Sequence, residues 1–164
     1  MGYQFIIVTV CTGAGATLLT DLWNLFLKRV FRIPSLNFCF LGRWILYMPL
    51  GTFRHKSIKE SPSRSMECLI GWIVHYGIGV SLTLIFILIM PADWSSNPTL
   101  LPALIYGIST VIFPLFILQP ALGLGMASSK TPQPVQAVFK SLMTHFTFGA
   151  GIWLMAIVMK YLLP

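Results

Sequence analysis

Three ionisable residues lie inside apolar stretches of this sequence, where a charged side chain is expensive to bury and therefore informative. They are Asp21, His75 and His145. An aspartate near histidines can bind and release protons around neutral pH, which suits a proton-linked carrier or an acid–base enzyme equally. The three residues come from separate stretches without an HxxxH or ExxH pair, so we expect no metal and no other cofactor.

Four apolar stretches must position these residues, and each is long enough to cross the roughly 30 Å core of a bilayer. We expect spans at residues 3–27, 68–90, 100–118 and 141–159, joined by inside loops at 28–67 and 119–140. Runs such as VSLTLIFILIM do not alternate in polarity, which excludes an outer-membrane barrel. The expected fold class is all-α, a polytopic membrane protein in which residues 1–164 form one membrane domain.

Composition supports the same class, since 56% of the 164 residues are hydrophobic and 9% are charged. Soluble domains carry about 25% charged residues, so a soluble globular protein is excluded. Intrinsic disorder is excluded by the high hydrophobicity. The three cysteines, at positions 11, 39 and 68, provide no framework for a small disulfide-stapled fold, and we interpret Cys68 as an ordinary buried thiol.

The basic residues predict the orientation, because cytoplasmic loops are enriched in lysine and arginine. Ten of the eleven fall in the two inside loops, and only Lys160 lies at the opposite end. Both termini are therefore expected in the periplasm of a bacterial inner membrane. This bias accounts for the net charge of +7 without nucleic acid, and it favours the lipid bilayer and its anionic headgroups as partners.

Both inside loops carry more than a connector needs. The first spans about 40 residues, longer than ordinary connections; its segment 41–50 (LGRWILYMPL) predicts an interfacial element, and 54–64 a solvated stretch. The second contains GLGMASSKTPQP, which is either a flexible linker or a backbone-rich loop that holds an anion with Lys130. Pro114 predicts a kink in the third span.

Depth along the spans places the polar residues at similar levels. At 1.5 Å per residue, Asp21, His75 and His145 lie about 9, 10 and 6 Å from the cytoplasmic ends of their helices, and Gln119 lies at such an end. Each of the three shares a helix face with small or hydroxyl-bearing residues, which favours close packing. The stripes are Gly13/Thr17/Asp21, Gly71/His75/Gly79 and Ser141/His145/Gly149.

This arrangement predicts a cytoplasm-facing pocket in the membrane. We expect it to be built from Asp21, His75, Gln119 and His145 and to be roofed by Arg43, His55 and Lys130. Arg43 is expected to neutralise Asp21. The alternative is a structural clasp, in which Asp21 accepts a hydrogen bond from His75 or Arg43 at about 0.6 to 2 kcal/mol per bond.

Several short motifs resemble a family of small bacterial inner-membrane proteins classed as a domain of unknown function. The resemblance covers nearly the whole chain and implies a four-helix inner-membrane protein, without implying an activity. The motifs that carry it are Asp21-Leu22-Trp23, Gly42-Arg43-Trp44, Phe53-Arg54-His55, Gly71-Trp72 with His75-Tyr76, Leu101-Pro102-Ala103-Leu104, Gln119-Pro120-Ala121, Lys130-Thr131-Pro132, and Ser141-Leu142 with His145 and Gly149.

Two classes of function compete. The pocket favours binding or transport of a small anionic, proton-linked solute, and transport would require a homo-oligomer because four helices are too few for a conventional carrier. The alternative is an enzyme acting on a lipid or lipid-linked substrate at the inner leaflet, with the basic loop holding a headgroup phosphate. A third reading is an accessory subunit of a membrane complex.

Overall fold

The computed structural model describes residues 2–162, and this part of the chain contains helices and connecting segments only. The long helices are α1 (Gly2–Phe31), α3 (Glu67–Ile89) and α6 (Pro134–Leu162). A fourth run joins α4 (Leu100–Ser109), the π-helical η2 (Pro114–Leu118) and α5 (Gln119–Ala121). These four segments are long and apolar enough to cross a membrane, so the expected all-α, multi-pass fold is confirmed.

The helices do not end where the expected spans end at every position, since α1 continues to Phe31 rather than to residue 27 and α6 starts early. Helix α6 begins at Pro134 rather than at residue 141, because proline fits the first turn of a helix, where its missing N–H has no partner to lose. Lys140, which we expected in a loop, therefore lies on a helix. At Pro114, where we expected a kink, the helix widens into a π turn, which accommodates the proline ring.

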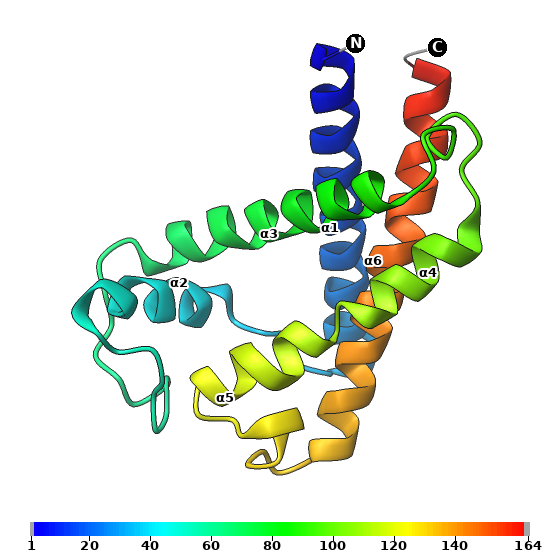
Figure 1. Ribbon diagram of the computed structural model, residues 1–164. Coiled ribbons are helices and arrows are strands. Elements are labelled where there is room, and N and C mark those ends of the chain that lie inside the picture. The colour runs from blue at the N-terminus through cyan, green and yellow to red at the C-terminus, as the bar shows by residue number, and fades with distance from the viewer. Residues whose placement is uncertain (1, 163–164) are drawn as a thin grey trace. The chain divides into compact units, whose positions relative to one another are not determined.

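The described chain divides into two compact units. Unit 1 contains the described parts of Met1–Ser35, Tyr76–Thr110 and Thr144–Pro164, and unit 2 contains Leu36–His75 and Val111–Met143. Within unit 1, the first turns of α1 and the last turns of α6 lie at the same end (Figure 1).

Close helix crossings hold unit 1 together at glycines. A Cβ atom added to Gly13 of α1 would lie 2.7 Å from the Cα atom of Val80 in α3. A Cβ atom on Gly107 of α4 would lie 2.6 Å from the Cα atom of Gly149 in α6. These backbones approach more closely than any larger residue permits. The expected packing role of the small-residue stripes is confirmed at Gly13 and Gly149.

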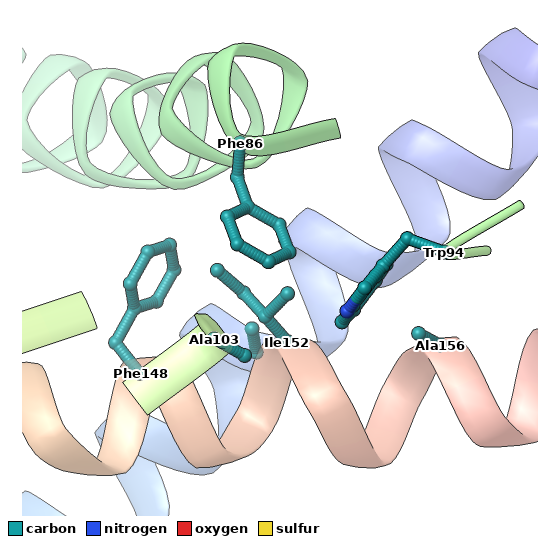
Figure 2. Close-up of a cluster of buried hydrophobic side chains, with 7 residues drawn as sticks. Phe86, Trp94, Ala103, Phe148, Ile152 and Ala156 are labelled. Carbon is teal, nitrogen blue, oxygen red and sulfur yellow. The ribbon is translucent and has the colours of Figure 1, made fainter. Parts of the chain in front are cut away.

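Aromatic and small side chains fill the core of unit 1 (Figure 2). Phe86 of α3 is fully buried, and the Trp94 ring meets it edge-on with the ring centroids 4.8 Å apart. Trp94 comes from the connection between α3 and α4, and its indole N–H donates to the Thr99 hydroxyl at 3.1 Å. That connection is therefore tied into the core. The cluster comprises Ala16, Phe86, Trp94, Ala103, Phe148, Ile152 and Ala156.

Unit 2 is built around α2 (Phe38–Tyr47) and η1 (Met48–Leu50), which contain the expected interfacial segment 41–50. Helix α2 starts earlier than expected because the Asn37 side chain caps it, accepting from the Cys39 N–H at 3.0 Å. The helix lies along the first half of α3 (Figure 1). A Cβ atom on Gly42 would lie 2.6 Å from the backbone nitrogen of Gly71, so the two backbones touch.

A disulfide joins α2 to α3 beside this contact. It links Cys39 and Cys68, each of which precedes the contacting glycine of its own helix by three residues. The interpretation of Cys68 as an ordinary buried thiol is therefore wrong: the residue is exposed and bonded. The physical reason is the glycine crossing, which brings two residues 29 positions apart to one point. Cys11 on α1 is an exposed free thiol.

Candidate functional site

The six residues predicted to bind substrate are divided between the two units. Asp21 and His145 belong to unit 1, whereas Arg43, His75, Gln119 and Lys130 belong to unit 2. Their convergence on one pocket stays a prediction. Among the described residues, no group of three His, Cys, Asp or Glu side chains is placed to hold a metal ion.

In unit 1, Asp21 accepts a hydrogen bond from a tyrosine. The Tyr76 hydroxyl of α3 donates to Asp21 Oδ2 over 3.1 Å. This contact is an interhelical clasp of the kind expected, but its donor is the residue that follows His75.

His145 is oriented by Thr110, the residue that ends α4. The Thr110 hydroxyl donates its one hydrogen to the Gly107 carbonyl at 2.6 Å. His145 Nδ1, 2.7 Å from the same oxygen, must then be the donor of their shared bond. The neutral imidazole assigned from this network carries its proton on Nδ1 and its lone pair on Nε2. Thr110 was not singled out from the sequence, because a threonine at a helix end is common.

Unit 1 also has an open groove of about 530 Å³ between α1, α4 and α6. Its walls are largely apolar and include Leu22, Phe26, Leu104 and Phe146. None of the predicted site residues lines this groove. Its composition suits hydrocarbon rather than an anionic solute.

In unit 2, Arg43 forms a buried, two-pronged ion pair with Glu67. Its Nε donates to Oε2 over 2.8 Å and its Nη2 to Oε1 over 2.7 Å. The remaining Nη1 donates to the carbonyls of Ile58 at 2.9 Å and Ser61 at 2.7 Å. The Glu67 carboxylate raises the pKa of Arg43 above its ordinary value. The expected partner was Asp21; the ion pair seen here instead secures the segment that follows α2.

His55 lies next to this ion pair and is buried. Ser61 donates its hydroxyl hydrogen to the Ser57 carbonyl at 3.0 Å, so His55 Nδ1 is the donor in its 2.8 Å bond to Ser61 Oγ. Nε2 is buried without a hydrogen-bond partner. Burial, together with the positive charge of Arg43, lowers the pKa of His55 below its ordinary value of 6.5.

The lowered pKa of His55 predicts that acid destabilises unit 2. As the pH falls below about 6.5, the unfolded chain takes up a proton that folded His55 resists, so the free energy of unfolding decreases. The loss levels off below the folded pKa. Thermal unfolding of the wild type and of His55→Asn between pH 8 and pH 4 should show a smaller acid-induced loss in the variant. Parallel profiles would contradict the assignment, because His75 and His145 are present in both proteins.

Backbone hydrogen bonds bring the two inside loops of the sequence together. The His55 N–H donates to the Ala121 carbonyl at 2.8 Å, and the Ile58 N–H donates to the Leu122 carbonyl at 3.1 Å. Gly123 has a left-handed φ of 86°, and a Cβ atom there would lie 2.7 Å from the carbonyl carbon of Lys56. The sequence pattern indicated two separate basic loops and not this contact.

The second loop is closed by its own hydrogen bonds. The Lys130 N–H donates to the Leu124 carbonyl at 2.9 Å, and the Thr131 N–H donates to the Ser128 carbonyl at 2.8 Å. Gly125, Ala127 and Ser128 all have positive φ angles, which give the loop sharp turns. The Lys130 side chain is exposed. Of the two interpretations of this segment, these hydrogen bonds and turns favour a loop with a defined backbone over a flexible linker.

The two remaining predicted residues lie on the helices of unit 2. The half-buried His75 ring stacks on Phe38 of α2, with 3.9 Å between the centroids. Gln119 Nε2 donates to Ser141 Oγ at 3.5 Å, a long bond, and Gln119 Oε1 is buried without a hydrogen-bond partner. His75 thus contributes to the contact between α2 and α3, and Gln119 retains an unused acceptor.

Comparison with known families bears on the chain as a whole. Residues 10–159 match the family described as "Protein of unknown function (DUF2938)". The chain belongs to this family. The resemblance inferred from the motifs is thereby confirmed, and the family description states no activity. No curated protein and no solved structure matches the chain.

Proposed function

We propose that this protein binds a small anionic solute where its two basic loops meet, on the cytoplasmic side of a bacterial inner membrane. The observation that carries the proposal is the pair of backbone hydrogen bonds from His55 and Ile58 to Ala121 and Leu122, which joins the loops. We expect the bound solute to be transported through a homo-oligomer. We also expect this transport to be linked to proton uptake by histidine.

The charge of unit 2 supports an anionic ligand. Its acidic residues are Glu60, which is exposed, and Glu67, whose charge is matched by Arg43. Exposed basic residues therefore outnumber free acids on the joined loops, and a cluster of one sign concentrates counter-ions nearby. The exposed cations of the joined loops are Arg54, Lys56, Lys59, Arg64 and Lys130.

A second candidate has the same chemistry with a different source of the anion. An enzyme or binding protein for anionic lipid would hold the headgroup phosphate at the same cations. The observation that favours it is α2, a short apolar helix that continues directly into the basic segment. Such a helix suits the interface between headgroups and acyl chains.

Removing Lys130 should weaken anion binding. A basic residue near an anionic partner contributes about 1 kcal/mol, so Lys130→Gln should lower the affinity for the relevant anion about fivefold. Lys160→Gln, at the end of α6, is the matched control and should leave the affinity unchanged. The protein is placed in phosphatidylcholine nanodiscs and titrated with inorganic phosphate or with succinate, and separately captured on vesicles with or without phosphatidylglycerol.

The outcomes separate the candidates. Saturable binding of a soluble anion, weakened by Lys130→Gln, supports the solute proposal. Binding that requires phosphatidylglycerol and ignores soluble anions supports the lipid candidate. Equal behaviour of Lys130→Gln and Lys160→Gln with every probe would contradict both.

The proposed orientation has its own test. Ten of eleven basic residues on the loop side predict that both termini are periplasmic. A C-terminal alkaline phosphatase fusion should therefore be active and a C-terminal fluorescent reporter that matures only in the cytoplasm should be dark. The reverse pattern would overturn the orientation and leave the binding measurement standing.

A further inference from the structure

The Cys39–Cys68 disulfide lies where two helices begin. Cys39 is the second residue of α2, after the Asn37 cap and Phe38, and Cys68 is the second residue of α3. The start of a helix carries partial positive charge from its free N–H groups. Such a position favours the thiolate of a cysteine over its thiol. Both sulfur atoms of this bond therefore become better leaving groups than they would be in a loop.

The two cysteines differ in exposure. Cys68 is exposed, whereas Cys39 is half-buried. Exchange begins when an external thiolate approaches one sulfur in line with the bond. The accessible sulfur is that of Cys68, and the one displaced is that of Cys39.

The contact between α2 and α3 does not depend on the disulfide. Gly42 and Gly71 bring the two backbones into contact, and Arg43 of α2 pairs with Glu67 of α3 through two hydrogen bonds. His75 stacks on Phe38 further along the same interface. Cleavage of the bond would therefore leave both thiols side by side and able to re-form it.

The cellular compartment bears on whether the disulfide is permanent or reversible, and this step rests on the orientation proposed above. The loop side that carries the basic residues faces the cytoplasm, where glutathione and thioredoxin keep thiols reduced. Disulfides that occur there in ordinary bacteria are transient, and are catalytic or redox-sensing. A permanent structural bond would instead belong on the periplasmic side.

We infer that Cys39 and Cys68 form a reversible thiol–disulfide exchange site whose substrate is a cytoplasmic thiol or dithiol. A substrate thiolate attacks Sγ of Cys68, the S–S bond breaks, and Cys39 leaves as a thiolate that takes a proton from water. A second substrate thiol then attacks the substrate sulfur of the mixed disulfide. Cys68 leaves as a thiolate and takes up the proton that the attacking thiol loses. The pair gains two electrons and two protons, and the substrate is oxidised to its disulfide.

The test is a redox titration of the full chain in nanodiscs. The protein is equilibrated with mixtures of reduced and oxidised glutathione, quenched in acid, denatured and labelled with a maleimide mass tag. We expect one tag, on Cys11, in oxidising mixtures and three tags in reducing ones, with both new tags appearing in a single transition. Cys11→Ser is the matched control: it should remove one tag at every point and leave the transition in place.

Single variants test the order of attack. Exposed to oxidised glutathione, Cys39→Ser should form its adduct at Cys68 at least tenfold faster than Cys68→Ser forms one at Cys39. Dithiothreitol should reduce the wild-type pair of Cys39 and Cys68. Unit 2 should stay folded after reduction and should still show a thermal unfolding transition. Because the readout is thiol labelling rather than ligand binding, loss of phosphate binding has no bearing on these results.

Two results would overturn the inference. One is a pair that stays oxidised in every glutathione mixture and is reduced only after denaturation, which identifies a structural bond. The other is a pair that stays reduced even in oxidised glutathione. A periplasmic location in the reporter assay would refute the proposed orientation, whereas the titration alone decides whether the pair exchanges.

Discussion

Replacing Arg43 by methionine should lower the free energy of unfolding by about 3 to 5 kcal/mol, because it strands the buried Glu67 carboxylate. Both members of the pair are about nine-tenths buried, at 8% and 9% exposed. The substitution also removes the donor to the carbonyls of Ile58 and Ser61. Denaturant titration of the purified protein in mixed micelles measures the loss.

Two further variants show whether burial of an unpaired charge is the cause. Arg54→Met removes an exposed cation from the same segment and should change the free energy of unfolding by no more than about 0.5 kcal/mol. Arg43→Met with Glu67→Leu removes both charges and should recover much of the stability. If the double variant is as unstable as Arg43→Met alone, the explanation fails.

Gly71→Ala should have the second large effect. The new Cβ atom would lie 2.7 Å from the carbonyl carbon of Phe38 and closer still to its oxygen, and backbone atoms cannot rotate away. Overpacking of this kind costs about 1 to 3 kcal/mol, and here it must also separate α2 from α3. We expect a lower unfolding temperature and slower formation of the Cys39–Cys68 disulfide after reduction.

Gly77 provides a matched control on the same helix. A Cβ atom there meets nothing within 4 Å, so Gly77→Ala adds a methyl group to open space. Alanine is favoured over glycine inside a helix by about 1 kcal/mol, so this variant should be neutral or more stable. Equal destabilisation by Gly71→Ala and Gly77→Ala would mean that the close approach at Gly71 is unimportant.

The spans were predictable because bilayer crossing imposes one local requirement, a long apolar run. The limits of α3 follow from such a local pattern to within one residue, whereas α1 continues past its expected end at residue 27 to Phe31. Helix α6 starts before the expected span at 141–159 because Pro134 permits a helix to begin there, although Gln136 and Lys140 interrupt the apolar run.

The hydrogen-bond partners of the polar residues were harder to predict than the positions of these residues along the helices. Asp21, Arg43 and His145 were singled out because of depth or motif, and each forms a hydrogen bond with a residue that was not expected as its partner: Tyr76, Glu67 and Thr110. The hydrogen-bond partner of a side chain depends on which helix faces meet. The sequence indicates how far along a helix a residue lies, but not how that helix is rotated about its axis. The repeated Cys-x-x-Gly spacing at 39–42 and 68–71 was the one available sign of the disulfide, since each glycine marks a close backbone approach.

The dependence of the first loop on Ala121 and Leu122 imposes an order on biogenesis. The N–H of His55 leaves the ribosome 66 residues before its acceptor carbonyl at position 121 is made. At about 5 to 20 residues per second, that interval is roughly 3 to 13 s. During this interval, the N–H groups of His55 and Ile58 lack these acceptors while two more spans are synthesised. A ribosome stalled between these two positions would therefore hold a chain whose first loop lacks the carbonyls that the His55 and Ile58 N–H groups bond to.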